Sequence, residues 1–328
     1  MTVLSTRALN RALLARQLLL ERAALPVPDA LERMGGLQAQ YAPSMYIGLW
    51  TRVADLERSA VTRLLQERAV VQATVLRGTI HLVSRADFWP LVEAVRETRY
   101  PADPALRDDI AEAARLLARG PLRRTDLGPA VRKHIHLWLD LVRVPPSGTW
   151  DRRRADVYGL AEDWIGPSAI GEAEAREHLV RRYLGAFGPA HRTEIATWAG
   201  LPAEAIAAVL GRLELRRFTD ERGRELVDLP QAPLPDPETP APVRFLPTWD
   251  AALLVHARRT LILPEEHRSK VFHTRMPQSI GTFLVDGQVA GTWTLSGSRV
   301  VWDPFVPLPA HVAREVEAEA ELLRAFHG

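Results

Sequence analysis

The hydrophobic positions of the first hundred residues follow a helical period at first and a strand period afterwards. Leucines spaced by three or four residues, with arginines on the opposite face, indicate an amphipathic helix that prolines end. Later, two β-rich runs meet around Arg77-Gly78. Helices followed by two strands are the order of a winged helix. The expected helices are residues 6–24, 29–34 and 56–67, and the expected strands are residues 70–76 and 79–83.

The same order of helices and strands recurs twice further along the chain, which indicates an internal repeat. In the second copy we expect helices at 109–119 and 127–139, then strands on either side of a Pro-Pro-Ser-Gly turn at 145–148. In the third copy we expect helices at 173–187 and 203–213, then strands at 215–218 and 225–229. The predicted winged-helix units are residues 1–100, 101–165 and 166–230.

A different composition follows the third unit. Residues 231–242 are a proline-rich linker, because so many prolines exclude both a helix and an interior strand. Residues 243–328 then alternate like antiparallel strands, with Asp286-Gly287 as a hairpin turn, and end in an acidic amphipathic helix. We therefore predict an α+β fold with three tandem winged-helix units and a C-terminal β-rich domain.

The composition excludes several classes of function. The chain has 328 residues, of which 47% are hydrophobic, and no cysteine, so disulfides, thiolate catalysis and cysteine-bound metals are excluded. The N-terminus lacks the order of a signal peptide, and no apolar run is long enough to span a membrane. We expect a cytoplasmic protein that does not associate with membranes.

Arginine dominates the basic side chains, with 40 arginines against two lysines. A GC-rich genome explains much of this bias, but arginine is also the residue that best binds phosphate. The second predicted wing carries Arg152, Arg153 and Arg154 in succession, and Arg192 begins a helix of the third unit. These four arginines are candidates for contacts with DNA phosphates, although such residues are as often plain surface charge.

Histidines are common metal ligands, but the spacing of the histidines in this chain does not support a metal site. His134 and His136 are two residues apart, so on a helix they would point to different faces, and the chain has no HExxH motif. Phosphate-binding and dinucleotide-binding glycine motifs are absent as well. We expect neither a metal nor another cofactor.

Gln38 and Gln40 follow the glycine pair that ends the second helix. Glutamine does not titrate, so this pair suits chemistry that needs a placed water or a stabilised cation. The simpler interpretation is that both amides satisfy backbone groups where the helix ends, and the residues alone favour it.

Five motifs in a fixed order favour the catalytic interpretation of Gln38 and Gln40 over the simpler one. The chain closely resembles the AlkZ-like winged-helix DNA glycosylases, and the matching segments run from residue 36 to residue 293. They are Gly36-Leu37-Gln38-Ala39-Gln40, Arg77-Gly78-Thr79-Ile80-His81-Leu82-Val83, Gly188-Pro189-Ala190, Leu246-Pro247-Thr248-Trp249-Asp250, and Phe283 through Trp293.

The resemblance implies a C-shaped protein around duplex DNA that excises bulky N7-alkylated purines, including interstrand crosslinks made by natural-product genotoxins. Gln38 and Gln40 match the catalytic Gln-x-Gln motif of the self-resistance branch. Ala39 departs from the larger apolar residue usual between them. The resemblance implies a monomer acting on double-stranded DNA, and we expect DNA contacts from Arg77, Thr79, His81, Trp249 and Asp250.

The chemistry is consistent with this assignment. Guanine alkylated at N7 is already cationic, so it can leave without protonation, and the deoxyribose then develops oxocarbenium character. Amide oxygens of Gln38 and Gln40 could orient water and stabilise that cation. No lysine lies near the motif, which argues against a Schiff-base lyase. Two alternatives remain at this point: a non-catalytic winged-helix DNA-binding protein or regulator, and a protein-interaction scaffold.

Overall fold

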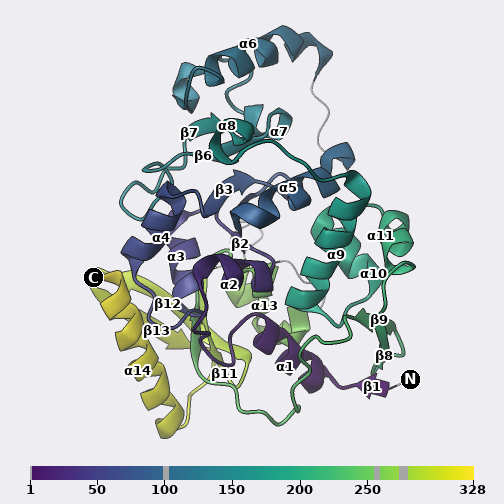
Figure 1. The fold of residues 1–328 in the computed structure, drawn as a ribbon. Helices are drawn as coiled ribbons and strands as arrows, with labels where there is room; N and C mark the ends of the chain where they lie inside the picture. Colours follow the sequence, from purple (N-terminus) through teal and green to yellow (C-terminus); the bar gives the residue numbers. More distant parts are fainter. Residues whose placement is uncertain (1, 99–102, 255–258, 273–279) are drawn as a thin grey trace.

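The computed structural model describes residues 2–98, 103–254, 259–272 and 280–328, and its fold is drawn in Figure 1. Three sheets organise the chain, with strand orders β1-β8-β9, β2-β4-β3-β6-β7-β5 and β10-β11-β12-β13. Helices surround them, which gives the predicted α+β class. Among the helices described, none combines the length and the apolar character needed to cross a bilayer.

The six-stranded sheet joins the first two predicted units. Strand β3 of the first unit pairs antiparallel with β6 of the second, with Gln72 opposite Arg143. The strands of the two predicted wings are therefore part of one continuous sheet. The predicted boundary between residues 100 and 101 lies outside the described residues. The strands are β2 (Leu37–Gln38), β3 (Val70–Thr74), β4 (Ile80–Ser84), β5 (Leu122–Arg123), β6 (Leu141–Arg143) and β7 (Val157–Leu160).

The first unit contains more helices than the sequence pattern predicts. Helix α3 was missed because each of its nine residues is buried, so no polar face marks it as amphipathic. The first helix is shorter than expected, since Leu18 has a left-handed φ of 55° directly after it. The helices are α1 (Thr6–Arg16), α2 (Val27–Met34), α3 (Ala42–Trp50), α4 (Arg58–Gln66) and α5 (Arg85–Ala94).

In the second unit the expected helix at 127–139 is wrong over most of its length. Only α7 (Ile135–Trp138) is helical, because Gly128 and Pro129 disfavour a helix at the start of that segment. The other helices of this unit are α6 (Arg107–Leu117) and α8 (Ala161–Ile165). Short 3-10 turns complete the described helices: η1 (Arg96–Thr98), η2 (Pro104–Leu106), η3 (Arg124–Asp126), η4 (Arg259–Leu261) and η5 (Glu265–His267).

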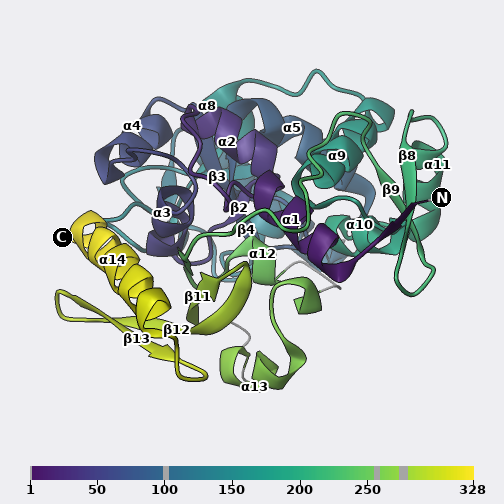
Figure 2. The same ribbon diagram turned by 90° about the horizontal axis from the view of Figure 1, so that it is seen from below.

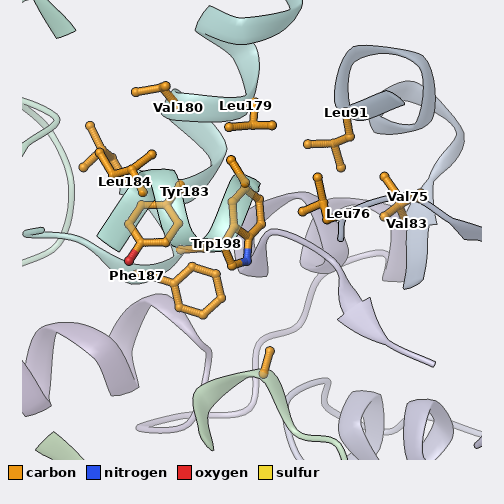
Figure 3. Close-up of a cluster of buried hydrophobic side chains, with 14 of the residues drawn as sticks. Val75, Leu76, Val83, Leu91, Leu179, Val180, Tyr183, Leu184, Phe187 and Trp198 are labelled. Atoms are coloured by element: carbon orange, nitrogen blue, oxygen red, sulfur yellow. The ribbon is translucent and has the colours of Figure 1, made fainter. Parts of the chain in front are cut away.

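The third unit contains the helices α9 (Glu172–Phe187), α10 (Arg192–Ala199) and α11 (Ala203–Leu210) and the strands β8 (Arg216–Asp220) and β9 (Glu225–Asp228). Strand β1 (Thr2–Leu4) pairs parallel with β8, so the start of the chain joins this unit. Helix α9 packs on α5, and a buried aromatic cluster lies beside them (Figure 3). In that cluster the ring of Tyr183 is 5.3 Å from those of both Phe187 and Trp198.

The C-terminal domain is an antiparallel sheet with α14 packed on it. Its hairpin turn at Asp286-Gly287 was predicted correctly, and both residues have positive φ, of 46° and 76°. In Figures 1 and 2 α14 and the outer strands of this domain lie on the side of the molecule away from the third unit, and α13 lies between them. Its elements are β10 (Arg244–Leu246), β11 (Gly281–Val285), β12 (Gln288–Ser296), β13 (Arg299–Pro304), α12 (Ala251–Leu254), α13 (Arg268–Val271) and α14 (Ala310–His327).

Ion pairs of two buried arginines join helix α1 to the outer parts of the molecule. Arg16 pairs with Asp228 of the third unit at 2.7 Å, with both side chains completely buried. Arg11 pairs with Asp286 of the C-terminal hairpin. Since burying a charge without a partner is costly, these contacts favour the observed arrangement of the parts around the first unit.

Candidate active site

The glycine pair positions the strand that carries the two glutamines. Gly35 and Gly36 have φ of 75° and 80°, and Gly36 N–H donates to the Leu31 carbonyl at 2.8 Å, which ends α2. A Cβ on Gly36 would lie 2.9 Å from Val83 Cγ1, so only glycine lets the turn approach β4 so closely. The turn also abuts the aromatic cluster, since a Cβ on Gly35 would lie 3.4 Å from Phe187 Cε2 and 3.7 Å from Trp198 Cζ2.

Strand β2 is an edge strand, and Gln38 lies directly opposite His81 on β4. Ala39 N–H donates to the Ile80 carbonyl at 2.8 Å, so Ala39 and Ile80 are the hydrogen-bonded pair next to Gln38 and His81. In an antiparallel sheet, hydrogen-bonded and non-hydrogen-bonded residue pairs alternate. The side chains of a non-hydrogen-bonded pair lie closer together, with Cβ atoms about 4.5–5.5 Å apart. Gln38 and His81 form such a close pair.

Gln40 ends this ladder with its own side chain. Its Oε1 accepts the Ile80 N–H at 2.6 Å, in the place where the Ala39 carbonyl would continue the pairing. The Ala39 carbonyl instead accepts from Gln72 Nε2 at 3.2 Å. Gln40 is exposed, whereas Gln38 is 8% and Ala39 1% exposed. Gln40 therefore holds its oxygen against the backbone and leaves its amide N–H groups for an incoming ligand.

His81 is a neutral side chain in this site. It is 5% exposed, and burial together with the positive charge of Arg77 lowers its pKa to about 3. Its Nδ1 lies 3.0 Å from the Thr79 carbonyl, which can only accept, so Nδ1 carries the hydrogen. The second nitrogen, Nε2, is then a hydrogen-bond acceptor on the same sheet face as Gln38. As a neutral group, His81 offers no positive charge to a DNA phosphate.

Two further residues expected at the DNA close the first wing. Thr79 Oγ1 donates to the Leu76 carbonyl at 2.9 Å, so its hydroxyl completes the turn between β3 and β4. Arg77 has a left-handed φ of 50° and is exposed, and its guanidinium donates to the Trp198 carbonyl at the end of α10. The first wing is therefore tied to the third unit.

The three adjacent arginines of the second wing do not share one environment. Arg153 Nη1 donates to the hydroxyl of Tyr41 at 2.9 Å, which places a cation beside the residue that follows Gln40. Arg154 pairs with Asp156 at 3.1 Å, and Arg152 is exposed. The loop that carries them is not a free wing tip, because Trp150 is buried against Tyr46 at a ring distance of 5.6 Å.

The structure corrects the expectation for Asp250. Its carboxylate accepts from Arg52 Nη1 at 2.9 Å and Nη2 at 2.8 Å, and both side chains are completely buried. Asp250 therefore stabilises the interior, and its completely buried carboxylate offers no surface to DNA. Trp249, beside it, is half-buried with φ of 65°. Arg192 is exposed at the first position of α10, and no described hydrogen bond or ion pair joins it to the glutamine motif.

Sequence reasoning missed Tyr41 and the Ser44–Thr248 contact. Tyr41 is 42% exposed, unusual for a large aromatic side chain, and its place directly after Gln40 was a usable signal. Ser44 Oγ lies 2.6 Å from Thr248 Oγ1, which joins α3 to the segment before α12, and only the fold shows this contact. Among the described residues, no group of three or more His, Asp or Glu side chains is arranged to hold a metal ion.

The arrangement is suited to chemistry without a titrating group. The hydrogen bonds described around β2 and β4 join glutamine amides, a neutral imidazole and backbone groups, and no carboxylate takes part in them. Such a site can place a water molecule and stabilise a positive charge through amide dipoles.

Comparisons with known proteins identify the family and the fold of the chain. The family model described as DNA glycosylase AlkZ-like matches residues 31–326. The interstrand DNA cross-link repair glycosylase of Streptomyces sahachiroi is 23% identical over 350 residues, which cover 93% of this chain and 92% of the relative. The solved structure of Streptomyces sahachiroi DNA glycosylase AlkZ has a TM-score of 0.79 at 21% identity, covering 99% of this chain and 97% of that one, so the fold is shared.

The family match confirms the resemblance seen in the sequence motifs and favours an enzyme over a non-catalytic DNA-binding protein. The match begins before the glutamine motif and continues through the C-terminal domain, so both parts of the molecule are included. The chain belongs to the AlkZ-like family of DNA glycosylases.

Proposed function

We propose that this DNA glycosylase hydrolyses the N-glycosidic bond of guanine carrying a bulky alkyl group at N7, in monoadducts and in interstrand crosslinks. The observation that carries the proposal is the pairing of Gln38 with a neutral His81 at an edge strand, where no carboxylate takes part in the described hydrogen bonds. An intact purine needs protonation in order to leave, whereas an N7-alkylated guanine is already a cation and does not.

Each side chain has a distinct part in this proposal. Because Gln38 lies opposite His81 in the strand register, His81 Nε2 can accept a hydrogen bond from the Gln38 amide nitrogen when DNA is bound, which would turn the Gln38 oxygen toward the deoxyribose and the attacking water. That oxygen stabilises the oxocarbenium character of the transition state. Gln40, whose oxygen is held by Ile80 N–H, donates from its amide nitrogen to the water or to a DNA oxygen. His81 acts as a positioning residue and the two glutamines as catalytic residues.

The second wing supplies part of the proposed DNA contact. Arg153 beside Tyr41 lies next to the glutamine motif and can pair with a backbone phosphate, while exposed Arg152 extends the same positive stretch. We propose that the protein acts as a monomer that surrounds duplex DNA in a C shape, in the service of resistance to a DNA-alkylating natural product. The absence of a described lysine at the motif supports a monofunctional reaction that ends at an abasic site.

The experiment compares duplexes that carry a bulky N7-alkylguanine, an undamaged guanine, or an N7–N7 interstrand crosslink. Wild-type protein should produce alkali-labile abasic sites in the first and separate strands from the third, and leave the second intact. Gln38→Ala should lose this activity, and the exposed α14 variant Arg314→Ala should keep it. The proposal fails if no abasic site forms, or if Gln38→Ala acts as fast as wild type.

A further inference from the structure

One buried arginine differs from the others because no described carboxylate pairs with it. Among the buried arginines that the structure describes, Arg11, Arg16, Arg52 and Arg244 each form an ion pair with a carboxylate. Arg143, on β6, is 3% exposed and forms none among the described residues. Its Nη2 donates to Thr74 Oγ1 at 3.0 Å, while Nε and Nη1 are buried and have no hydrogen-bond partner in the described part of the chain.

The surroundings of Arg143 compensate its charge only weakly. Its guanidinium lies over the ring of Tyr158 at 4.8 Å, a cation–π contact. Burial lowers the pKa of Arg143, and nearby Tyr158 raises it. A fully desolvated charge is costly unless it is paired. The Arg143 guanidinium therefore keeps a positive charge that no described carboxylate neutralises, and two of its N–H groups have no described acceptor.

A cavity of about 400 Å³ lies where the three predicted winged-helix units meet, and Arg143 reaches its wall through the hydrogen bond to Thr74. We call it the inter-unit pocket, and it contains Thr74, the hydrogen-bond partner of Arg143. Its walls come from the end of β3 and the first wing, the turn after α5, α7 of the second unit and the turn between α10 and α11. The lining residues are Thr74, Val75, Arg77, Gly78, Val95, Thr98, His136, Leu137, Ala199 and Gly200.

The lining of the inter-unit pocket is basic and contains no acid among the described residues. Arg77 and Thr98 are exposed at its rim, and Thr74 is buried. His136 Nδ1 is buried without a partner, and the His136 ring stacks on Tyr158 at 6.4 Å. Burial, followed by the positive charges of Arg143, His134 and Arg124, lowers the pKa of His136 to about 4, so at neutral pH it can offer an N–H donor without a charge.

Hydroxyl, imidazole and guanidinium donors around one cavity are the groups that bind a phosphate. We propose that the inter-unit pocket binds a phosphodiester of the DNA strand next to the lesion, with Arg77 at the rim and Arg143, linked through Thr74, supplying the positive charge. Arg77 precedes Thr79 and His81 by only a few residues, so the pocket and the glutamine motif share the turn between β3 and β4. The choice of DNA as the source of the phosphate rests on the proposed function.

The first experiment measures anion binding without DNA. Thermal unfolding of the full-length protein is followed in increasing inorganic phosphate, with sodium chloride keeping the ionic strength constant. The melting temperature of wild type should rise with phosphate, because a ligand of the folded state stabilises it. Arg143→Met should lose this rise, whereas Arg314→Met on α14 should keep it. Without phosphate, Arg143→Met should be at least as stable as wild type, since it removes an unpaired buried charge.

Two results would overturn the assignment at this stage. One is a phosphate response that is the same in Arg143→Met and in wild type. The other is a large fall in the melting temperature of Arg143→Met without phosphate, which would show that its charge is already compensated inside the protein. Thr74→Val, which removes only the connecting hydroxyl, is the second variant, and its phosphate response should be smaller than that of wild type.

The second experiment separates DNA phosphate from a free anion. Affinity for an undamaged duplex is measured against salt concentration, and loss of one phosphate contact should reduce the slope of log K against log salt by about 0.9. Arg143→Met and Arg77→Gly should each show this loss. A phosphate response in the melting assay together with an unchanged slope would overturn the DNA assignment. Because this duplex carries no lesion, the result is independent of whether Gln38 catalyses excision.

Discussion

The replacement of Asp250 by asparagine distinguishes most clearly between a structural and a DNA-binding part for the Leu246–Asp250 motif. Asparagine has nearly the same shape as aspartate, so the substitution removes the charge with little change in volume. In the structure Asp250 accepts two N–H groups of Arg52, at 2.9 and 2.8 Å, and the Ala252 N–H at 3.0 Å. The Arg52 side chain is completely buried and would keep its charge without a partner.

The size of the effect follows from these contacts. Each hydrogen bond to a charged group contributes about 1.5–3 kcal/mol, and removal of one partner of a buried ion pair costs about 3–5 kcal/mol. Arg52 keeps its bonds to the carbonyls of Gln17 and Gly48, so part of its polar surface remains satisfied. We expect Asp250→Asn to lose about 3–5 kcal/mol of unfolding free energy, a large share of the roughly 5–15 kcal/mol of a typical protein.

Urea denaturation followed by tryptophan fluorescence measures this loss, with the slope against urea expected to stay constant. The exposed Asp303→Asn is the matched control and should leave stability almost unchanged. The double variant Arg52→Met/Asp250→Leu should recover much of the stability, because neither charge of this pair remains. A stable Asp250→Asn protein that binds DNA weakly would refute this reasoning and return Asp250 to the DNA interface.

Three further predictions concern the glutamine motif and its neighbours. Gly36→Ala should lower the free energy of unfolding by about 1–3 kcal/mol and slow excision, because the φ of Gly36 is 80° and a Cβ would lie 2.9 Å from Val83. Gly185→Ala is the matched control: this glycine lies within α9, and no described atom beyond its own helix backbone would lie within 4 Å of its Cβ. The substitution should raise the free energy of unfolding by about 0.5–1 kcal/mol in the same denaturation assay. The pKa of His81 is about 3 in the folded protein and about 6.5 in the unfolded chain, so the unfolded chain binds the proton first as the pH falls. His81 therefore lowers the free energy of unfolding as the pH drops from about 6.5 to about 3. His81→Asn should flatten this part of the stability–pH curve. Arg153→Ala should reduce the salt slope of DNA binding by about 0.9 and leave the melting temperature unchanged.

The sequence pattern predicted those elements whose polar and apolar faces differ. Helices α9 and α14 and the Asp286-Gly287 hairpin were found because their periodicity or turn chemistry is local. Helix α3 was missed since it is buried all round, and most of the helix expected at 127–139 does not form after Gly128-Pro129. Local preference is overridden where tertiary contacts or backbone breakers dominate.

The site shows the same division between local and long-range information. Gly35-Gly36 and the glutamine motif could be identified from adjacent residues. The pairing of Gln38 with His81, however, depends on the register of two strands about forty residues apart, which spacing alone does not fix. Asp250 was expected at the DNA because its motif matched the family, but its partner Arg52 lies far away in sequence and could be found only in the fold.

Arg143 illustrates the limit of motif-based reasoning most clearly. It lies in an ordinary strand sequence, and its neighbours Thr74 and His136 come from different parts of the chain. The lack of a described carboxylate partner for Arg143 depends on how the interior is assembled and not on any local sequence pattern.

The central claim is that Gln38 catalyses excision of a base that is already cationic. Its most direct test is the single-turnover release of free N7-alkylguanine from duplex DNA, quantified by mass spectrometry for wild type and Gln38→Ala at several pH values. The account predicts release by wild type at a rate nearly constant between pH 6 and 8, since no titrating side chain is assigned to the reaction, and a loss of about 100-fold or more in the variant, as for removal of one preorganised group at a transition state. Equal rates for the two proteins, or release of unmodified guanine by wild type, would contradict it.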